Sequence, residues 1–142
     1  MLTNEKTFLK TGLAQLEVDR ILIEKLKPSI EYLTYNIRRY DVPVTLVLFY
    51  TEMDISESLS KSMRLTDVET TIQIGDSYFN FVFLPFTDGV DSYTFIKKVE
   101  NSDLTNIKNF FYFEILEPTI YCYNTLINRF LDEIIEDQKN QY

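Results

Sequence analysis

The sequence contains no histidine, and Cys122 is its single cysteine. Without histidine the chain cannot form a Ser-His-Asp or Cys-His catalytic arrangement, and it offers no histidine ligand to a metal. One thiol excludes an internal disulfide and a cysteine-based zinc site, and we interpret Cys122 as a small packing residue. Any general acid–base chemistry is therefore left to carboxylates, lysine or tyrosine.

Glycine, proline and basic residues are also scarce. With three glycines and four prolines, long flexible linkers are not expected, and neither GxxxxGK[ST] nor GxGxxG occurs. Lys and Arg number 14 against 22 Asp and Glu, and the resulting net charge of −8 argues against a nucleic-acid partner. No run approaches the ~18–20 apolar residues of a membrane helix, and the first residues lack an apolar signal region. We therefore expect a cytoplasmic protein with no nucleic-acid or membrane partner and no cofactor.

The residues that are present predict one domain over residues 1–142, of which 45% are apolar. Between Leu13 and Arg39 apolar residues recur at helical spacing, which predicts a helical N-terminal segment at 1–40. Pro28 lies inside this segment and is expected to kink the helix or to start a second one. The run Val44–Tyr50 is continuously apolar and rich in β-formers, as in a strand buried on both faces.

Further elements follow at regular intervals. The stretch after residue 51 predicts a short helix, with Asp54 as its cap and Glu57 three residues later. Two β-rich runs around Gly75, Asp76 and Ser77 predict a hairpin. A helix, a dense strand and a final amphipathic helix are expected at 87–100, 109–116 and 119–138.

This order predicts the α+β class. Residues 43–116 read strand, helix, strand, strand, helix, strand, which is the ferredoxin-like βαββαβ arrangement with an antiparallel sheet. The N-terminal helical segment and the C-terminal helix are expected to flank that unit. Because this fold supports many functions, it does not by itself select one.

Several stretches, in the right order, resemble a GGDEF domain of the diguanylate-cyclase type. They are "LKTGL" at 9–13, "NIRRYDVPVTLVLFY" at 36–50, "RLTD" at 64–67, "FVFLPFTDGVDSYTFIKKVE" at 81–100 and "NTLINRFLDEII" at 124–135. The similarity is spread over nearly the whole chain.

The residues that bind metal and nucleotide in that family are replaced in this chain. Where the resemblance places the GGDEF signature, this chain has Gly75-Asp76-Ser77-Tyr78. Tyr50 and Glu52 occupy the two positions of the Asp-x-Asp that supplies a metal ligand, and a small slip would place Glu52 and Asp54 there. The helix that follows is shorter than in the family and lacks the residues that bind guanine. The resemblance therefore implies a degenerate domain without cyclase activity.

Arg64 and Asp67 match the family's RxxD, which implies a binding site for cyclic di-GMP. Arginine can hold a phosphate or a guanine edge, and aspartate can accept hydrogen bonds from guanine N–H groups. The alternative is an exposed ion pair that closes a helix, which would contribute little to stability.

Glu52, Asp54 and Asp76 are candidate ligands of a leftover Mg²⁺ site. The alternative assigns a helix cap to Asp54 and a turn position to Asp76.

Three functions stay open on the sequence. The first is a non-catalytic regulatory or protein-interaction domain with a protein partner or a second copy of itself. The second is a cyclic di-GMP receptor through Arg64 and Asp67. The third is a metal-dependent nucleotide enzyme of altered chemistry that uses Glu52, Asp54 and Asp76.

Overall fold

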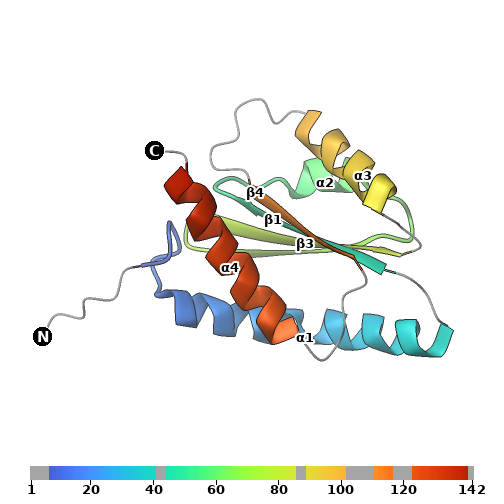
Figure 1. Cartoon of the computed structure of the whole chain (residues 1–142), viewed down its shortest axis with the longest axis horizontal. Coiled ribbons are helices and arrows are strands. Elements are labelled where there is room, and N and C mark those ends of the chain that lie inside the picture. The colour runs from blue at the N-terminus through green and yellow to red at the C-terminus, as the bar shows by residue number, and fades with distance from the viewer. Residues whose placement is uncertain (1–6, 41–43, 86–88, 102–110, 117–122, 141–142) are drawn as a thin grey trace, which may run out of the picture.

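The computed structural model describes residues 7–40, 44–85, 89–101, 111–116 and 123–140 (Figure 1). Its elements follow in the order α1 (Gln15–Tyr40), β1 (Val44–Thr51), α2 (Ser56–Ser62), β2 (Val68–Ile74), β3 (Ser77–Pro85), α3 (Gly89–Asn101), β4 (Phe111–Leu116) and α4 (Tyr123–Asn140). No described helix is both long enough and apolar enough to cross a membrane.

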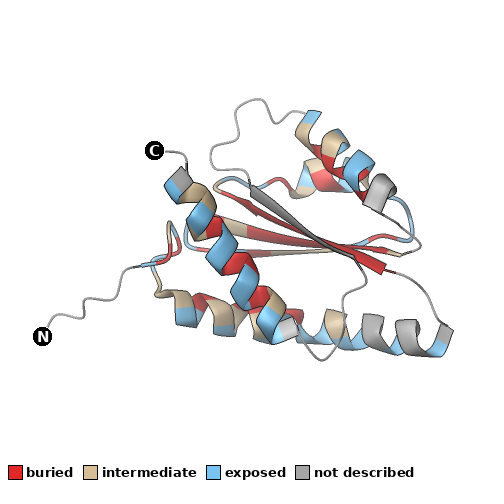
Figure 2. Cartoon of the chain, viewed as in Figure 1, coloured by how far each residue is buried: buried red, intermediate tan, exposed pale blue. Residues whose placement is uncertain are grey.

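The strands form one antiparallel sheet in the order β2-β3-β1-β4. β1 pairs with β3 on one side and with β4 on the other, and each of its residues is buried (Figure 2). This confirms the prediction that Val44–Tyr50 is an interior strand. An unbroken apolar run is what such a position requires, because both faces of the strand are covered.

Helices cover both faces of the sheet, with α1 and α4 on one side and α2 and α3 on the other (Figure 1). Successive side chains of a strand point to opposite faces. Accordingly, Leu46 and Leu48 join the core beneath α1 and α4, whereas Val47 and Phe49 join the core beneath α2 and α3. The apolar stripe predicted for the C-terminal helix is confirmed by the buried residues of α4, which are Ile127, Phe130, Leu131 and Ile134.

The predicted hairpin is confirmed as β2 and β3, joined by Gly75 and Asp76. Ile74 lies opposite Ser77, so the loop has two residues, and the φ of Gly75 is +60°. Because Gly75 has a positive φ and Asp76 does not, the turn is of type II′, whose twist matches that of the flanking strands.

The α+β class with an antiparallel sheet is therefore confirmed, and the described order begins with a helix. The expected helix is wrong for residues 7–14, which form a loop closed by a bridge between Thr7 and Ala14. Positive φ values at Leu9 and Gly12 are incompatible with a right-handed helix. Below, residues 7–14 are called the N-terminal loop.

Pro28 does not end the helix, because α1 continues from Gln15 to Tyr40 as one element. The predicted second segment is therefore wrong. The apolar face of α1 packs on the core through Val18, Leu22, Leu26 and Ile30, on both sides of the proline. This burial offsets the hydrogen bond that a proline removes. Cys122 and the predicted helix start at 119–122 lie outside the described residues.

Candidate functional site

The three predicted metal ligands lie around one open hollow beside the β2–β3 turn. Glu52, Asp54 and Asp76 line it together with Lys10, Met53 and Tyr78, and its volume is about 490 Å³. The three carboxylates therefore lie along the same hollow. Within the described ranges, however, no three acidic, cysteine or histidine side chains come together as a group able to hold a metal ion. Lys10 adds a positive charge to the same hollow, which disfavours a cation there.

Asp54 has a local structural role at the start of α2. Its Oδ1 accepts a hydrogen bond from the backbone N–H of Ser56 at 2.9 Å. The N-cap position itself belongs to Ile55, which makes no side-chain cap bond, so the predicted capping box of Asp54 and Glu57 is wrong. Asp54 thus forms an Asx-type turn just before the helix.

Tyr50, at the position where the resembling family has an acid, is completely buried. Its hydroxyl and that of Ser77 lie 3.1 Å apart in a hydrogen bond, and its ring packs at 5.4 Å from the ring of Phe79. Burial raises the pKa of Tyr50 to about 12, the hydrogen bond to Ser77 opposes this rise, and the charge of Glu52 adds to it. The side chain is therefore a neutral phenol at physiological pH and no ligand for a divalent cation.

The hairpin turn packs through its backbone against the N-terminal loop, and Gly75 and Asp76 stay exposed to solvent. The backbone N–H of Asp76 donates to the carbonyl of Lys10 at 2.9 Å. A Cβ at Gly75 would lie 2.5 Å from the oxygen of Lys10 and 2.6 Å from that of Thr11. Glycine is required here for this close approach as well as for the positive φ. The backbone of the turn therefore contacts the chain's own loop.

The loop is itself held in place by Thr11. Its hydroxyl donates to the carbonyl of Phe8 at 2.6 Å and accepts from the N–H of Leu13 at 3.1 Å. Phe8 is 2% exposed and packs against Phe79, which ties the loop to the main core. The backbone contact between this loop and the turn is thus a built feature of the fold.

Arg64 and Asp67 form a clamp in the loop between α2 and β2. Asp67 accepts the backbone N–H of Arg64 at 2.8 Å and a guanidinium N–H at 2.9 Å. A second guanidinium N–H bond reaches the carbonyl of Pro85, at the end of β3, at 2.8 Å. The guanidinium therefore fastens this loop to the sheet.

The expectation of an exposed pair that closes a helix is wrong in two respects. The Asp67 side chain is only 1% exposed, whereas that of Arg64 is 50% exposed. Both residues also lie beyond the end of α2 at Ser62. The carboxylate is buried because its lone pairs are met by the N–H groups of Arg64, which satisfies a charge that would otherwise be expensive to desolvate.

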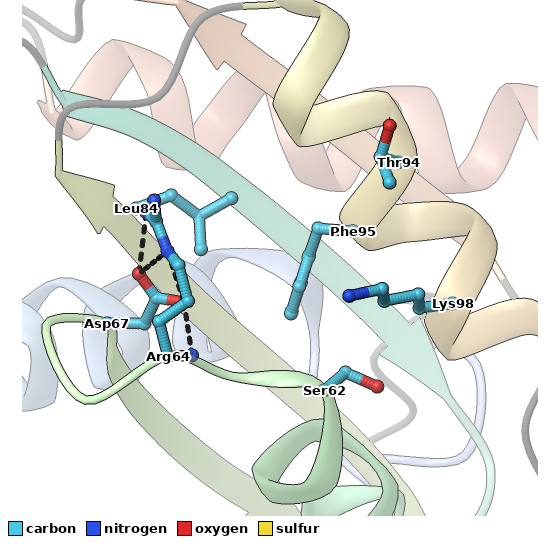
Figure 3. Close-up of a pocket in the computed structure, with 7 residues that line it drawn as sticks. All are labelled: Ser62, Arg64, Asp67, Leu84, Thr94, Phe95 and Lys98. Carbon is cyan, nitrogen blue, oxygen red and sulfur yellow. Dashed lines mark hydrogen bonds and ion pairs between the residues drawn. The ribbon is translucent and has the colours of Figure 1, made fainter.

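A pocket of about 270 Å³ opens beside this clamp (Figure 3). Its lining joins Arg64 and Asp67 to Ser62, Leu84, Thr94, Phe95 and Lys98. Lys98 and Thr94 come from α3, and Figure 3 shows the Lys98 side chain beside Phe95, across the pocket from Arg64. Among the described residues, no ion pair engages Lys98.

Sequence reasoning missed Lys98 as a neighbour of Arg64. The two residues are far apart in the chain and approach only because α3 packs over the sheet next to the α2–β2 loop. No local pattern marks such a pairing. The pocket consequently carries two cationic groups and two hydroxyl side chains around an apolar floor, and one carboxylate that is already paired.

Comparisons with known proteins identify no relative, since no family model, no curated protein and no solved structure matches the chain.

Proposed function

We propose that this chain is a non-catalytic regulatory or protein-interaction domain, with the ferredoxin-like arrangement of a degenerate GGDEF domain, that acts in the cytoplasm. The family in this proposal comes from the sequence resemblance. The lack of catalysis is proposed because the residues that bind metal and nucleotide in that family are replaced in this chain. A protein partner or a second copy of the chain is the partner that this function implies.

The backbone contact between the β2–β3 turn and the N-terminal loop is the observation that carries the proposal. In the resembling family, nucleotide and metal bind at this hairpin and at the end of the strand that corresponds to β1. Here the N–H of Asp76 is bound by Lys10, and Tyr50 is buried against Ser77. Backbone donors in fixed positions are what a phosphate-binding turn supplies, so a donor bound within the chain opposes that use.

Calorimetric titration of GTP with Mg²⁺ tests this proposal at the level of binding. We expect no heat beyond dilution for the full chain. Micromolar binding that disappears in Asp76→Ala would overturn the proposal, because that result requires a turn that still binds nucleotide.

The third interpretation, a metal-dependent nucleotide enzyme, receives no support from the hollow. Lys10 stands among the carboxylates, and Asp54 is engaged at the start of α2. Tyr50, at the end of β1, supplies a buried hydroxyl bonded to Ser77 in place of an acid.

A cyclic di-GMP receptor is the second candidate, and Lys98 is the observation that favours it. A dianionic ligand needs more than one cation in a protein whose overall charge is negative. Lys98 and Arg64 line the same pocket, which supplies the second cation. Against it stands the engagement of Arg64 by Asp67 and Pro85.

Titration with cyclic di-GMP distinguishes the two candidates. Under the interaction proposal no binding is measured. Micromolar binding that is lost in Lys98→Ala, with the fold retained by circular dichroism, would favour the receptor. Lys98→Ala is a clearer test than Arg64→Ala. Lys98 makes no described ion pair, whereas Arg64 also holds the α2–β2 loop in place.

A further inference from the structure

Strand β2 forms one edge of the sheet, with β3 as its hydrogen-bonded neighbour. Apart from the ladder to β3, the described residues make no backbone–backbone hydrogen bond to residues 68–74. An edge of this kind presents a row of backbone donors and acceptors that can pair with another strand.

The hairpin geometry identifies which groups face outward. Ile74 and Ser77 flank the two-residue turn and therefore form a hydrogen-bonded pair. Pairing alternates along an antiparallel ladder, so even-numbered residues of β2 bond to β3. The N–H and C=O groups of Glu69, Thr71 and Gln73 consequently point to the free edge.

Most of the usual protections of an edge strand are missing from β2. Its sequence, VETTIQI, has no proline and no lysine, and Glu69 is its single charge. The pairing with β3 runs one-to-one from Val68 to Ile74 without a bulge. Close to the start of the strand, Leu65 is fully exposed and Val68 is 37% exposed. An edge with so few of these protections remains open to pairing.

The edge is complementary to itself in one antiparallel register. Centred on Thr71, this register places Glu69 opposite Gln73 and Thr71 opposite its own copy. All three outward-facing residues then lie in hydrogen-bonded positions, and each pair exchanges two bonds. Every residue also keeps its face of the sheet, and Val68 meets the apolar Ile74 of the other copy.

From these features we propose that the β2 edge binds the β2 edge of a second copy of this chain, in antiparallel register about Thr71. The two sheets join into one continuous sheet across a two-fold axis. The inference rests on the proposed interaction function and names its partner and its surface. Shifting the register to bring Glu69 opposite Glu69 would place like charges face to face, which disfavours that alternative.

Association should be weak and dependent on salt. One short strand pair buries less surface than a stable interface requires, which places the dimer in the transient class. Each copy carries a net charge of −8, so two copies repel at low ionic strength. Raising the salt concentration from about 0.01 M to about 1 M screens this repulsion, and the dimer should tighten.

Sedimentation velocity on the full chain over a concentration series tests the edge. We expect a monomer–dimer equilibrium that Thr71→Pro abolishes, since proline removes an N–H that faces outward and is tolerated at a strand edge. Thr71→Val is the matched control. It loses the same hydroxyl bond to Asn80 but keeps the N–H, so it should dimerise as the parent does.

Charge at position 73 tests the register without removing any backbone group. Gln73 is exposed, so the monomer should tolerate both Gln73→Lys and Gln73→Glu. Opposite Glu69 of the other copy, lysine should tighten the dimer roughly two- to thirty-fold and glutamate should weaken it comparably. Glu133→Gln, on the exposed face of α4, changes the net charge as Gln73→Lys does and should have a much smaller effect.

A chain that stays monomeric at the highest concentrations and at high salt would refute this inference. A dimer indifferent to Thr71→Pro, or to the sign of the charge at 73, would refute it equally, because another surface would then hold the copies together. Neither result bears on catalysis, which the assays with GTP decide separately.

Discussion

At the scale of single residues, Tyr50 at the end of β1 determines whether a metal ion can be bound beside the hairpin. Tyr50 is a phenol buried against the hydroxyl of Ser77, at the position where the resembling family has a carboxylate. A buried phenol with a pKa of about 12 stays neutral and contributes packing. Tyr50 is therefore a part of the core and not a metal ligand.

Tyr50→Phe should lower the free energy of unfolding by about 1–3 kcal/mol, because it leaves the Ser77 hydroxyl buried without its partner. Chemical denaturation measures this loss. Tyr93→Phe, at a side chain that is 55% exposed, is the control and should change stability by under about 0.5 kcal/mol. Equal effects of the two substitutions would show that the buried hydrogen bond contributes nothing.

Asp19 on α1 is a residue whose charge opposes folding. Burial raises its pKa above the ordinary value of 3.8, the charge of Asp132 raises it further, and its buried Oδ1 has no hydrogen-bond partner among the described residues. The folded state thus binds this proton more tightly than the unfolded state. Stability from this site is present below pH 3.8 and is lost as the pH rises through the folded-state pKa.

Asp19→Asn should accordingly stabilise the protein at pH 7 by about 0.2–1 kcal/mol, the range for partly exposed charges. The gain should vanish as the pH falls below 4, because Asp19 is then protonated and is as neutral as the asparagine that replaces it. Denaturation curves at several pH values measure it, with Glu133→Gln on the exposed side of α4 as the control. A gain that persists unchanged at low pH would contradict the electrostatic explanation.

At the scale of elements, two loops carry the long-range contacts around the candidate sites. The α2–β2 loop is clamped by Arg64 to Asp67 and to the end of β3. The N-terminal loop lies against the β2–β3 turn through Lys10 and Thr11. Each contact predicts a measurable contribution to stability that does not depend on a ligand.

Arg64→Ala should cost about 1–3 kcal/mol, because it leaves the buried Asp67 carboxylate without its charged donor. Lys98→Ala, in the same pocket but without a described ion pair, should stay within about 0.5 kcal/mol of the parent. Thermal denaturation compares them. If Arg64→Ala proves as mild as Lys98→Ala, the pair is no clamp, and Arg64 is then available to a ligand.

Gly75→Ala tests the contact between turn and N-terminal loop. Its Cβ would lie 2.5 Å from the carbonyl oxygen of Lys10, and its φ of +60° adds strain. Gly12→Ala is the matched control, since its φ is +77° but no atom lies within 4 Å of the added carbon. We expect Gly75→Ala to be more destabilising by about 1–3 kcal/mol, the cost of overpacking. Similar costs for both would mean that the loop does not press against the turn.

At the scale of the whole molecule, the patterns that predicted structure correctly are local ones. The apolar run at Val44–Tyr50 identified the interior strand, and the glycine and turn residues at 75–77 identified the hairpin. The α4 stripe followed from helical periodicity. In each case the signal is a property of neighbouring residues, which sequence spacing records directly.

The features that escaped prediction depend on contacts between distant segments. Nothing near Lys98 indicates that α3 brings it to Arg64, and nothing near Lys10 indicates that its carbonyl meets the turn at Asp76. The burial of Asp67 likewise depends on the packing of its loop against the end of β3. For the same reason, the helical periodicity that begins near Leu13 did not reveal the loop at residues 7–14.

The central claim is that the fold is used without catalysis, and turnover of GTP tests it most directly. Purified full-length chain at high concentration, incubated with GTP and Mg²⁺ or Mn²⁺, is assayed for cyclic dinucleotide by chromatography. We expect no product above a blank without protein. Product that increases with protein concentration and disappears in Asp76→Ala would contradict it.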